Sequence, residues 1–169
     1  HQQSNYPFDV FRQHRSRQDE PSYADIQKYA AKNMFVRVIP SKTSLYQGDQ
    51  LTLSYNLYHT IQFQSLMSSK NPNFNEFLSE EFKLPEPNPN ERPPIEEYNG
   101  KRYYVQEFKR VTLFPTKSGK ITIEPIELSS EILIPVTDNF FGMVVGYEPY
   151  EYNFKSNAID LDIKPLPEK

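Results

Sequence analysis

The sequence predicts an all-β fold: an antiparallel immunoglobulin-like β-sandwich of about seven strands, with a short N-terminal helical or extended segment. Fifteen prolines and only five glycines in 169 residues exclude a mainly helical chain. Several stretches alternate apolar and polar residues with the two-residue period of a half-buried strand, and turn residues separate these stretches. The length fits one domain with an extension.

Residues 1–33 differ in composition from the rest of the chain. Gln, Arg and Ser are frequent among the first twenty residues, which contain too few apolar side chains for a core. Residues 22–32 hold good helix formers behind a proline, with apolar side chains along one face, which predicts a short helix. A linker is the alternative. We expect residues 1–33 to form a linker or N-terminal extension and residues 34–169 to form the sandwich domain.

The first predicted strands follow from residue 34. Residues 34–39 are rich in β-branched side chains and end at a proline. Gly48-Asp49 predicts a turn. Residues 51–58 place Leu or Tyr at every odd position and a polar or tyrosine side chain at every even one, and residues 61–65 continue as a further short strand. These stretches supply one half of the sandwich.

The strands of the second half of the sandwich follow a less regular stretch of sequence. Residues 74–84 show no clear period, and the proline-rich run that follows them cannot supply a sheet ladder, so it predicts a loop or an edge connection. Asn99-Gly100 is a hairpin turn signal. The remaining expected elements are strands at 103–114, 120–124, 126–136 (one or two) and 158–164, and an aromatic loop at 138–152.

The residue inventory argues against an enzyme. No cysteine is present, which excludes disulfides, thiol nucleophiles and cysteine-based metal sites. The three histidines are far apart, and His59 is expected at the surface; a hydrolase would need it to meet a serine and a carboxylate. Asp160 and Asp162 alternate onto the outer face of a strand. We predict no catalytic residues, no cofactor and no metal site.

Charge and hydropathy restrict the partners. A net charge of −3 and a pI of about 5.7 do not suit nucleic-acid binding. No apolar run approaches the roughly 20 residues of a membrane-spanning helix. The chain begins with His1, so we expect it to be a piece of a longer protein whose signal peptide and membrane anchor lie outside it, and we expect no membrane contact by this piece itself.

Opposite charges follow one another along the chain. Residues 76–97 carry seven acidic and two basic side chains, a balance of −5, and residues 101–120 carry six basic and one acidic, a balance of +5. These charges pair across neighbouring strands or simply stay solvated, or they form a two-signed docking surface for a protein partner. Lys109 and Arg110 are the candidate partner-binding residues of the basic stretch.

The stretch 140–147 is the strongest candidate for an exposed apolar patch. It reads Phe-Phe-Gly-Met-Val-Val-Gly-Tyr, and exposed apolar patches mark contacts with partners or with neighbouring domains. We take Phe140, Phe141, Val144 and Tyr147 as candidate contact residues. The alternative is that this stretch folds back over an open end of the sandwich.

A second kind of function is a carbohydrate- or other ligand-binding sandwich. Exposed aromatic rings would serve as stacking platforms for such a ligand. The candidate rings are Tyr103, Tyr104, Tyr147, Tyr150 and Tyr152.

Three ordered blocks resemble the BatD (Bacteroides aerotolerance, or oxygen tolerance) family. They are residues 33–58 (Asn-Met-Phe-Val-Arg-Val through Leu-Thr-Leu-Ser-Tyr-Asn-Leu-Tyr), residues 99–125 (Asn-Gly-Lys-Arg-Tyr-Tyr-Val through Ile-Thr-Ile-Glu-Pro) and residues 156–167. Their order and spacing, more than any single block, carry the resemblance.

The resemblance implies an exported bacterial envelope protein. Such proteins look like tandem immunoglobulin-like domains with a membrane helix near the C-terminus, encoded beside von Willebrand factor A-domain Bat proteins and a MoxR-type ATPase. It therefore implies a periplasmic domain of a membrane-anchored aerotolerance or stress-response protein, and it attributes no catalytic residues to it. The implied function is non-enzymatic protein–protein interaction, with those Bat proteins and neighbouring domains of the same chain as partners.

Overall fold

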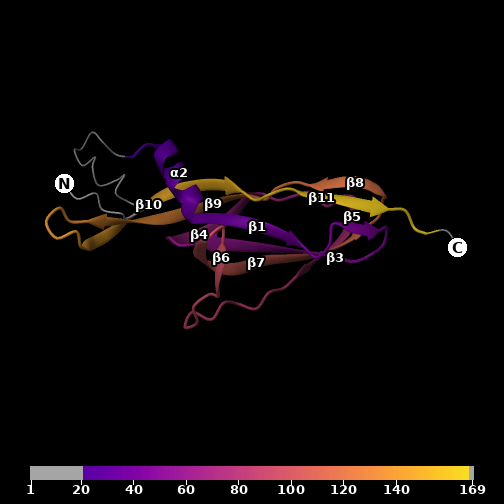
Figure 1. The fold of residues 1–169 in the computed structure, drawn as a ribbon, viewed down its shortest axis with the longest axis horizontal. Coiled ribbons are helices and arrows are strands. Elements are labelled where there is room, and N and C mark those ends of the chain that lie inside the picture. Colours follow the sequence, from indigo (N-terminus) through magenta and orange to yellow (C-terminus); the bar gives the residue numbers. More distant parts are fainter. Residues whose placement is uncertain (1–20, 168–169) are drawn as a thin grey trace.

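The computed structural model describes residues 21–167, which form many strands and one short helix (Figure 1). The all-β prediction is confirmed. The helix α2 spans Tyr23–Asn33. The strands are β1 (Met34–Pro40), β2 (Ser44–Tyr46), β3 (Leu51–His59), β4 (Gln62–Lys70), β5 (Phe77–Phe82), β6 (Ile95–Tyr98), β7 (Lys101–Pro115), β8 (Gly119–Ile123), β9 (Glu127–Thr137), β10 (Val144–Lys155) and β11 (Ile159–Lys164).

The strands form three sheets. The largest has the order β1-β3-β7-β5, and β6 also pairs with β7; the other two have the orders β10-β9-β4 and β2-β11-β8. Neighbouring strands run antiparallel except β2 and β11, which pair in parallel. The predicted antiparallel sandwich is confirmed, with β2 and β11 as the one parallel pair among the described strands.

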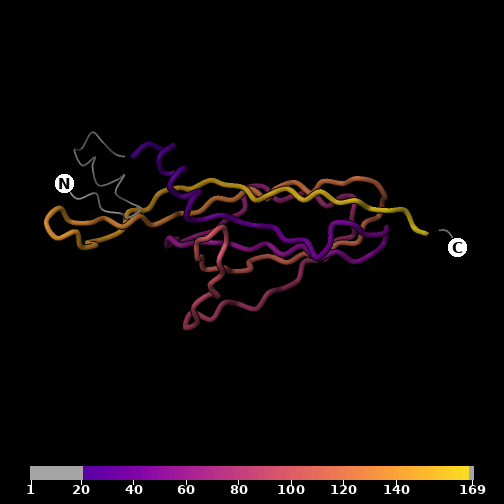
Figure 2. Tube along the Cα trace, in the orientation of Figure 1, coloured from indigo at the N-terminus to yellow at the C-terminus, as the bar shows by residue number. Residues whose placement is uncertain are grey.

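One buried core joins the sheets into a sandwich. Alternate side chains of β3 point inward, as the sequence predicted, and meet inward side chains of β9 and β11 from the smaller sheets. Leu53, Leu113 and Ile132 are fully buried in this core. The elongated shape in Figure 2 follows from strands that lie along one axis on both sides of the core.

Helix α2 confirms the predicted short helix and packs on the sandwich. The Ser22 side chain caps it by accepting a hydrogen bond from the Asp25 amide (3.2 Å). Ile26 and Ala30 are buried in the same core as the strands. Asn33, also buried, accepts from the Lys101 ammonium (2.7 Å). Residues 1–20 of the predicted extension lie outside the described residues, and a domain boundary after residue 33 stays a prediction.

The helix also covers an edge of a smaller sheet. The Gln27 amide donates to the Glu151 carbonyl (2.8 Å) and accepts from the Asn153 amide (2.9 Å), so it takes the place of a neighbouring strand along β10. Pro149 lies two residues earlier on the same edge of β10 and has no backbone N–H group. Gln27 and Pro149 together close this part of β10 to further strands.

The structure has more strands than the seven expected. Within residues 21–167 there are eleven, and the four that the sequence did not predict are β2, β5, β6 and β10. The predicted aromatic loop over 138–152 is wrong from Val144 onward, where β10 pairs with β9. Most β5 and β10 side chains are exposed on both faces, so these strands lack the alternation that reveals a half-buried strand.

Strand β7 organises the large sheet. The predicted Asn99-Gly100 turn is confirmed: both residues have positive φ (51° and 80°), and they join β6 to β7 in a two-residue hairpin. On one side β7 is paired with β3, over residues 104–113. On its other side it is paired with β6 at residues 101–104 and with β5 at residues 110–115.

Two buried tyrosines give a matched pair of stability predictions. The Tyr55 hydroxyl is buried without a hydrogen-bond partner, whereas the Tyr152 hydroxyl donates to the Met34 carbonyl (2.8 Å). We expect Tyr152→Phe to lower the free energy of unfolding by about 1–3 kcal/mol, because the buried carbonyl loses its donor, and Tyr55→Phe to leave it unchanged or raise it by up to about 1 kcal/mol. Equilibrium urea unfolding measures both. A larger loss for Tyr55→Phe than for Tyr152→Phe would contradict the assignment.

Candidate functional site

The β9–β10 hairpin ends in an apolar tip, residues 138–147, which we call the hairpin tip. Figures 1 and 2 show it reaching beyond the sheets at one end of the long axis. The Asp138 carboxylate accepts hydrogen bonds from the amides of Phe140 (3.0 Å) and Gly142 (3.1 Å), and the Asp138 amide donates to the Met143 carbonyl (2.9 Å). These bonds hold the turn in one conformation.

The apolar side chains of the hairpin tip face solvent. Phe140 is 92 % exposed and Phe141 is 82 % exposed, and Val144 and Tyr147 are each about half exposed. Met143 and Val145 between them are also exposed. The four candidate residues predicted for this stretch therefore lie together. The tip does not cover an end of the sandwich, which was the alternative.

Lys109 and Arg110 do not join the hairpin tip, because β7 belongs to the large sheet and the tip to the sheet of β10, β9 and β4. The Arg110 guanidinium binds the Glu107 carboxylate through two nitrogens and lies 5.0 Å from the centroid of the Phe82 ring. This bond lowers the pKa of Glu107, with a further contribution from Ser54, while burial opposes it. Lys109 places its ammonium 5.7 Å from the centroid of the Tyr55 ring.

The acidic and basic stretches do not neutralise each other. Both lie wholly within the described residues, and no ion pair joins residues 76–97 to residues 101–120. Arg110 instead pairs with Glu107 on its own strand, where a bulge in β7 brings the two together. Glu97 and Arg102 lie opposite each other across the β6–β7 pair without forming an ion pair. That the charges stay solvated and that they form a docking surface both stay predictions.

The five candidate tyrosines do not form one stacking platform. Tyr103 and Tyr152 are buried, and Tyr152 stacks on Phe154 with ring centroids 4.4 Å apart. Tyr104 and Tyr150 are half-buried. Tyr147 alone of the five is largely exposed, at the hairpin tip. A carbohydrate site built from all five rings is therefore absent from the described part of the chain.

His59 is partly buried, whereas the sequence placed it at the surface. Its Nδ1 lies 3.2 Å from the Ile61 carbonyl oxygen, and its ring packs edge-on against Phe63 and near Tyr104. Burial lowers the pKa of His59, which favours the neutral ring. Among residues 21–167 no serine or carboxylate contacts the ring through a hydrogen bond or ion pair, so the arrangement a hydrolase would need is not formed there.

The acidic pair of β11 lies on the outer face, as predicted. Asp160 and Asp162 are exposed, and Asp160 accepts a hydrogen bond from the Thr122 hydroxyl (2.7 Å). Within the described ranges no group of three or more potential ligands is arranged to hold a metal ion. None of the helices described there is long and apolar enough to cross a bilayer.

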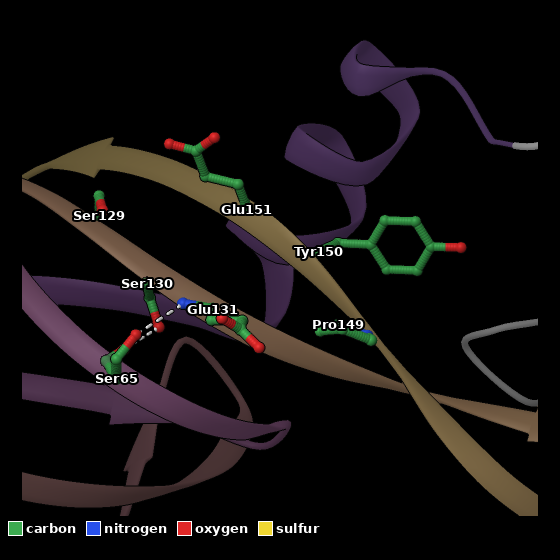
Figure 3. A pocket seen from close by; sticks show the side chains of 7 residues that line it. All are labelled: Ser65, Ser129, Ser130, Glu131, Pro149, Tyr150 and Glu151. Carbon is green, nitrogen blue, oxygen red and sulfur yellow. Dashed lines mark hydrogen bonds between the residues drawn. The ribbon is translucent and has the colours of Figure 1, made fainter.

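A polar pocket of about 390 Å³ lies on the sheet of β10, β9 and β4 (Figure 3). Two of its hydroxyl groups are engaged within the sheet: Ser130 donates to the Ser65 carbonyl, and the Ser65 hydroxyl accepts from the Glu131 amide (3.3 Å). Figure 3 shows the Tyr150 and Glu151 side chains pointing away from these serines. The lining of the pocket contains no histidine, so the pocket holds no serine–histidine pair.

A second concavity was not predicted from the sequence. A groove of about 530 Å³ lies between the proline-rich loop 84–94 and residues 105–108 of β7. The only sequence signal was the proline run itself, which marked a loop without showing what faces it. We call this concavity the β7 groove.

Comparison with known proteins agrees with the fold. A family model described as the BatD DUF11-like domain matches residues 38–163, which include β2 to β10, the end of β1 and most of β11. Neither the curated proteins nor the solved structures contain a significant match to the chain. The match covers most of the sequence and spans the sandwich itself. The chain belongs to the BatD family.

Proposed function

We propose that this domain is a non-enzymatic protein-interaction module of a membrane-anchored envelope protein, located in the periplasm, and that the hairpin tip is its contact surface. The observation that carries the proposal is the exposure of Phe140 and Phe141 on a projecting turn. Family membership supports the envelope setting and a role in oxygen tolerance or stress response. The proposed partners are von Willebrand factor A-domain Bat proteins and neighbouring domains of the same chain.

The hairpin tip has the properties of a protein contact. Large contiguous apolar surface costs free energy in water and is uncommon on a protein that has no partner. Aromatic side chains carry much of the binding free energy in protein interfaces. Because the Asp138 bonds already fix the turn, binding loses less conformational entropy than it would for a loose loop.

The non-enzymatic part of the proposal rests on the surroundings of the candidate groups. His59 is bound to a backbone carbonyl and packed among aromatic rings, and the serines of the polar pocket are hydrogen-bonded within the sheet. Neither arrangement activates a nucleophile, which needs an adjacent base.

The test is to replace the tip phenylalanines in the full-length protein in its own envelope. We expect Phe140→Asp with Phe141→Asp to reduce co-purification of the von Willebrand factor A-domain Bat proteins by at least about tenfold, because two desolvated carboxylates oppose an apolar interface. The free energy of unfolding of the 169-residue chain should change by less than about 0.5 kcal/mol, since both side chains are exposed.

The matched control places the same charges on exposed apolar positions elsewhere. Met67 and Leu166 are 66 % and 62 % exposed and lie outside the hairpin tip. Met67→Asp with Leu166→Asp should leave co-purification at its normal level. If the tip variant retains its partners, or if the control variant loses them equally, the hairpin tip is not the contact surface.

A further inference from the structure

The large sheet has a gap in its outer edge. Residues 105–109 of β7 lie between the part paired with β6 and the part paired with β5, and they have a strand neighbour, β3, on one side only. At the border of the gap the Val105 amide donates to the Pro94 carbonyl (2.9 Å). Since backbone groups alternate in direction along a strand, the Glu107 N–H points to the same open side.

The β7 groove lies at this gap. Its lining includes Phe108 and the nearly buried Val105, and its wall is the loop 84–94, which Figures 1 and 2 show swinging away from the sheet between β5 and β6. A volume of about 530 Å³ falls within the roughly 300–1,000 Å³ of ligand pockets. A segment that spanned the five-residue gap as a strand would be about 17 Å long, at about 3.3 Å per residue.

The walls of the β7 groove are held in place. Within the loop, the Glu91 amide donates to the Asn88 carbonyl (3.0 Å). At one end β6 is held by Tyr98, whose ring centroid lies 4.3 Å from the Arg37 guanidinium carbon. At the other end Phe82 of β5 packs against Arg110. A groove that exists before its ligand arrives binds with a smaller loss of entropy.

The edge of β10 provides a contrast within the same molecule. There the Gln27 amide occupies the strand edge and Pro149 removes a donor, two devices that prevent pairing with another chain. At residues 105–109 the Pro94 carbonyl occupies only the Val105 amide and a bulge lies beside Glu107, while the neighbouring loop bends away and leaves room. An open edge beside a preformed groove is the geometry that proteins use to bind a peptide as an additional strand.

The charged side chains around the β7 groove indicate which kind of segment binds there. The segment that surrounds the gap, residues 76–97, carries seven carboxylates and two basic side chains. Glu86, Glu91 and Arg92 line the groove and are exposed. Two basic groups of β7 are already engaged, because Arg110 is paired with Glu107 and Lys101 is bound to Asn33. The half-buried Phe108 ring and the excess of carboxylates fit a peptide that alternates apolar and basic side chains.

We propose that the β7 groove binds an extended, basic segment of a partner protein, which pairs with residues 105–109 of β7 as a short strand. This contact goes beyond the hairpin tip and is independent of it. The main chain of the peptide satisfies the open backbone groups of β7. Its apolar side chains pack beside Phe108, and its basic side chains face Glu86 and Glu91.

The experiment uses fluorescently labelled, acetylated peptides of about nine residues, long enough to span the gap. The probe alternates Val and Lys. One control peptide alternates Val and Glu, and another has the probe sequence with N-methylated main-chain amides. Fluorescence anisotropy measures the dissociation constant, and amide chemical shifts locate the contact. We expect the probe to bind more weakly as salt increases, to perturb residues 105–109, and to bind at least about tenfold more tightly than either control peptide.

Matched charge reversals test the location. Glu86→Lys with Glu91→Lys should weaken probe binding by at least about tenfold. Glu131→Lys with Glu151→Lys makes the same change of charge at exposed positions of the opposite sheet and should weaken it by less than about threefold. Equal effects of the two variants overturn the proposal, as do equal binding of the N-methylated peptide, equal binding of the Val–Glu peptide, and failure of the probe to bind.

The hairpin-tip variant separates this contact from the proposed function. Phe140→Asp with Phe141→Asp should bind the probe as the unmodified protein does, because the tip and the β7 groove lie in different sheets. Normal probe binding by a tip variant that has also kept its envelope partners would refute the proposed function alone. Loss of probe binding in the tip variant would overturn the independence of the groove.

Discussion

Leu53→Ala lowers the free energy of unfolding by about 2–5 kcal/mol, the usual cost of truncating a fully buried leucine. Leu53 is inaccessible to solvent in the central strand β3, opposite Val111 of β7. Alanine would remove favourable burial and leave a cavity between sheets that both contribute to the core. Equilibrium urea unfolding of the 169-residue chain measures the change.

The control for this prediction is a leucine in the same sheet that is mostly outside the core. Leu78 of the edge strand β5 is 67 % exposed. Leu78→Ala should change the free energy of unfolding by no more than about 0.5 kcal/mol. Comparable losses for Leu53→Ala and Leu78→Ala would show that the buried layer of β3 is not the centre of the fold.

The strands that could be predicted are those with one buried face. Residues 51–58 and 159–164 alternate between core and solvent, and their side chains record that alternation in the sequence. The Asn99-Gly100 turn was equally readable, because positive φ at both positions restricts the choice of residues. At these positions the local backbone conformation and the burial in the fold favour the same types of residue.

The strands that the sequence did not predict depend on pairing with a neighbouring strand. β5 has one buried residue, Phe77, and β10 has one, Tyr152, so neither presents a continuous inward face. What makes them strands is main-chain pairing with β7 and β9, and backbone pairing leaves little trace in side-chain identity. The proline at position 149 is tolerated in β10 because it lies on an edge where no donor is needed.

The candidate site, too, could be predicted only in part from the sequence. The apolar stretch 140–147 could be located because its composition is unusual for an exposed turn, but its projection from the molecule follows from the length of the β9–β10 hairpin. The pairing of Arg110 with Glu107 could not be predicted from the sequence, because it depends on a bulge in β7 that brings the two side chains together. The β7 groove depends on two short strands that pair with the same side of β7, a matter of topology alone.

Alkali should destabilise the domain through two buried phenols. Burial raises the pKa of Tyr55 and of Tyr152 from 10.0 to about 12. Below pH 10 both groups are neutral in the folded and the unfolded chain, so their contribution to stability is constant. As the pH rises from 10 towards 12, the unfolded chain loses these protons first, and the free energy of unfolding falls.

The expected loss is large because two groups act together. At about 1.4 kcal/mol per pKa unit, each phenol contributes on the order of 2–3 kcal/mol by the time the pH passes its folded-state pKa. Urea unfolding at a series of pH values, with phenolate absorbance recorded in parallel, measures the slope. Tyr55→Phe with Tyr152→Phe removes both phenols and should flatten the decline above pH 10. An unchanged slope in that variant would mean that other groups control the alkaline transition, because phenylalanine at the two positions keeps the ring and cannot ionise.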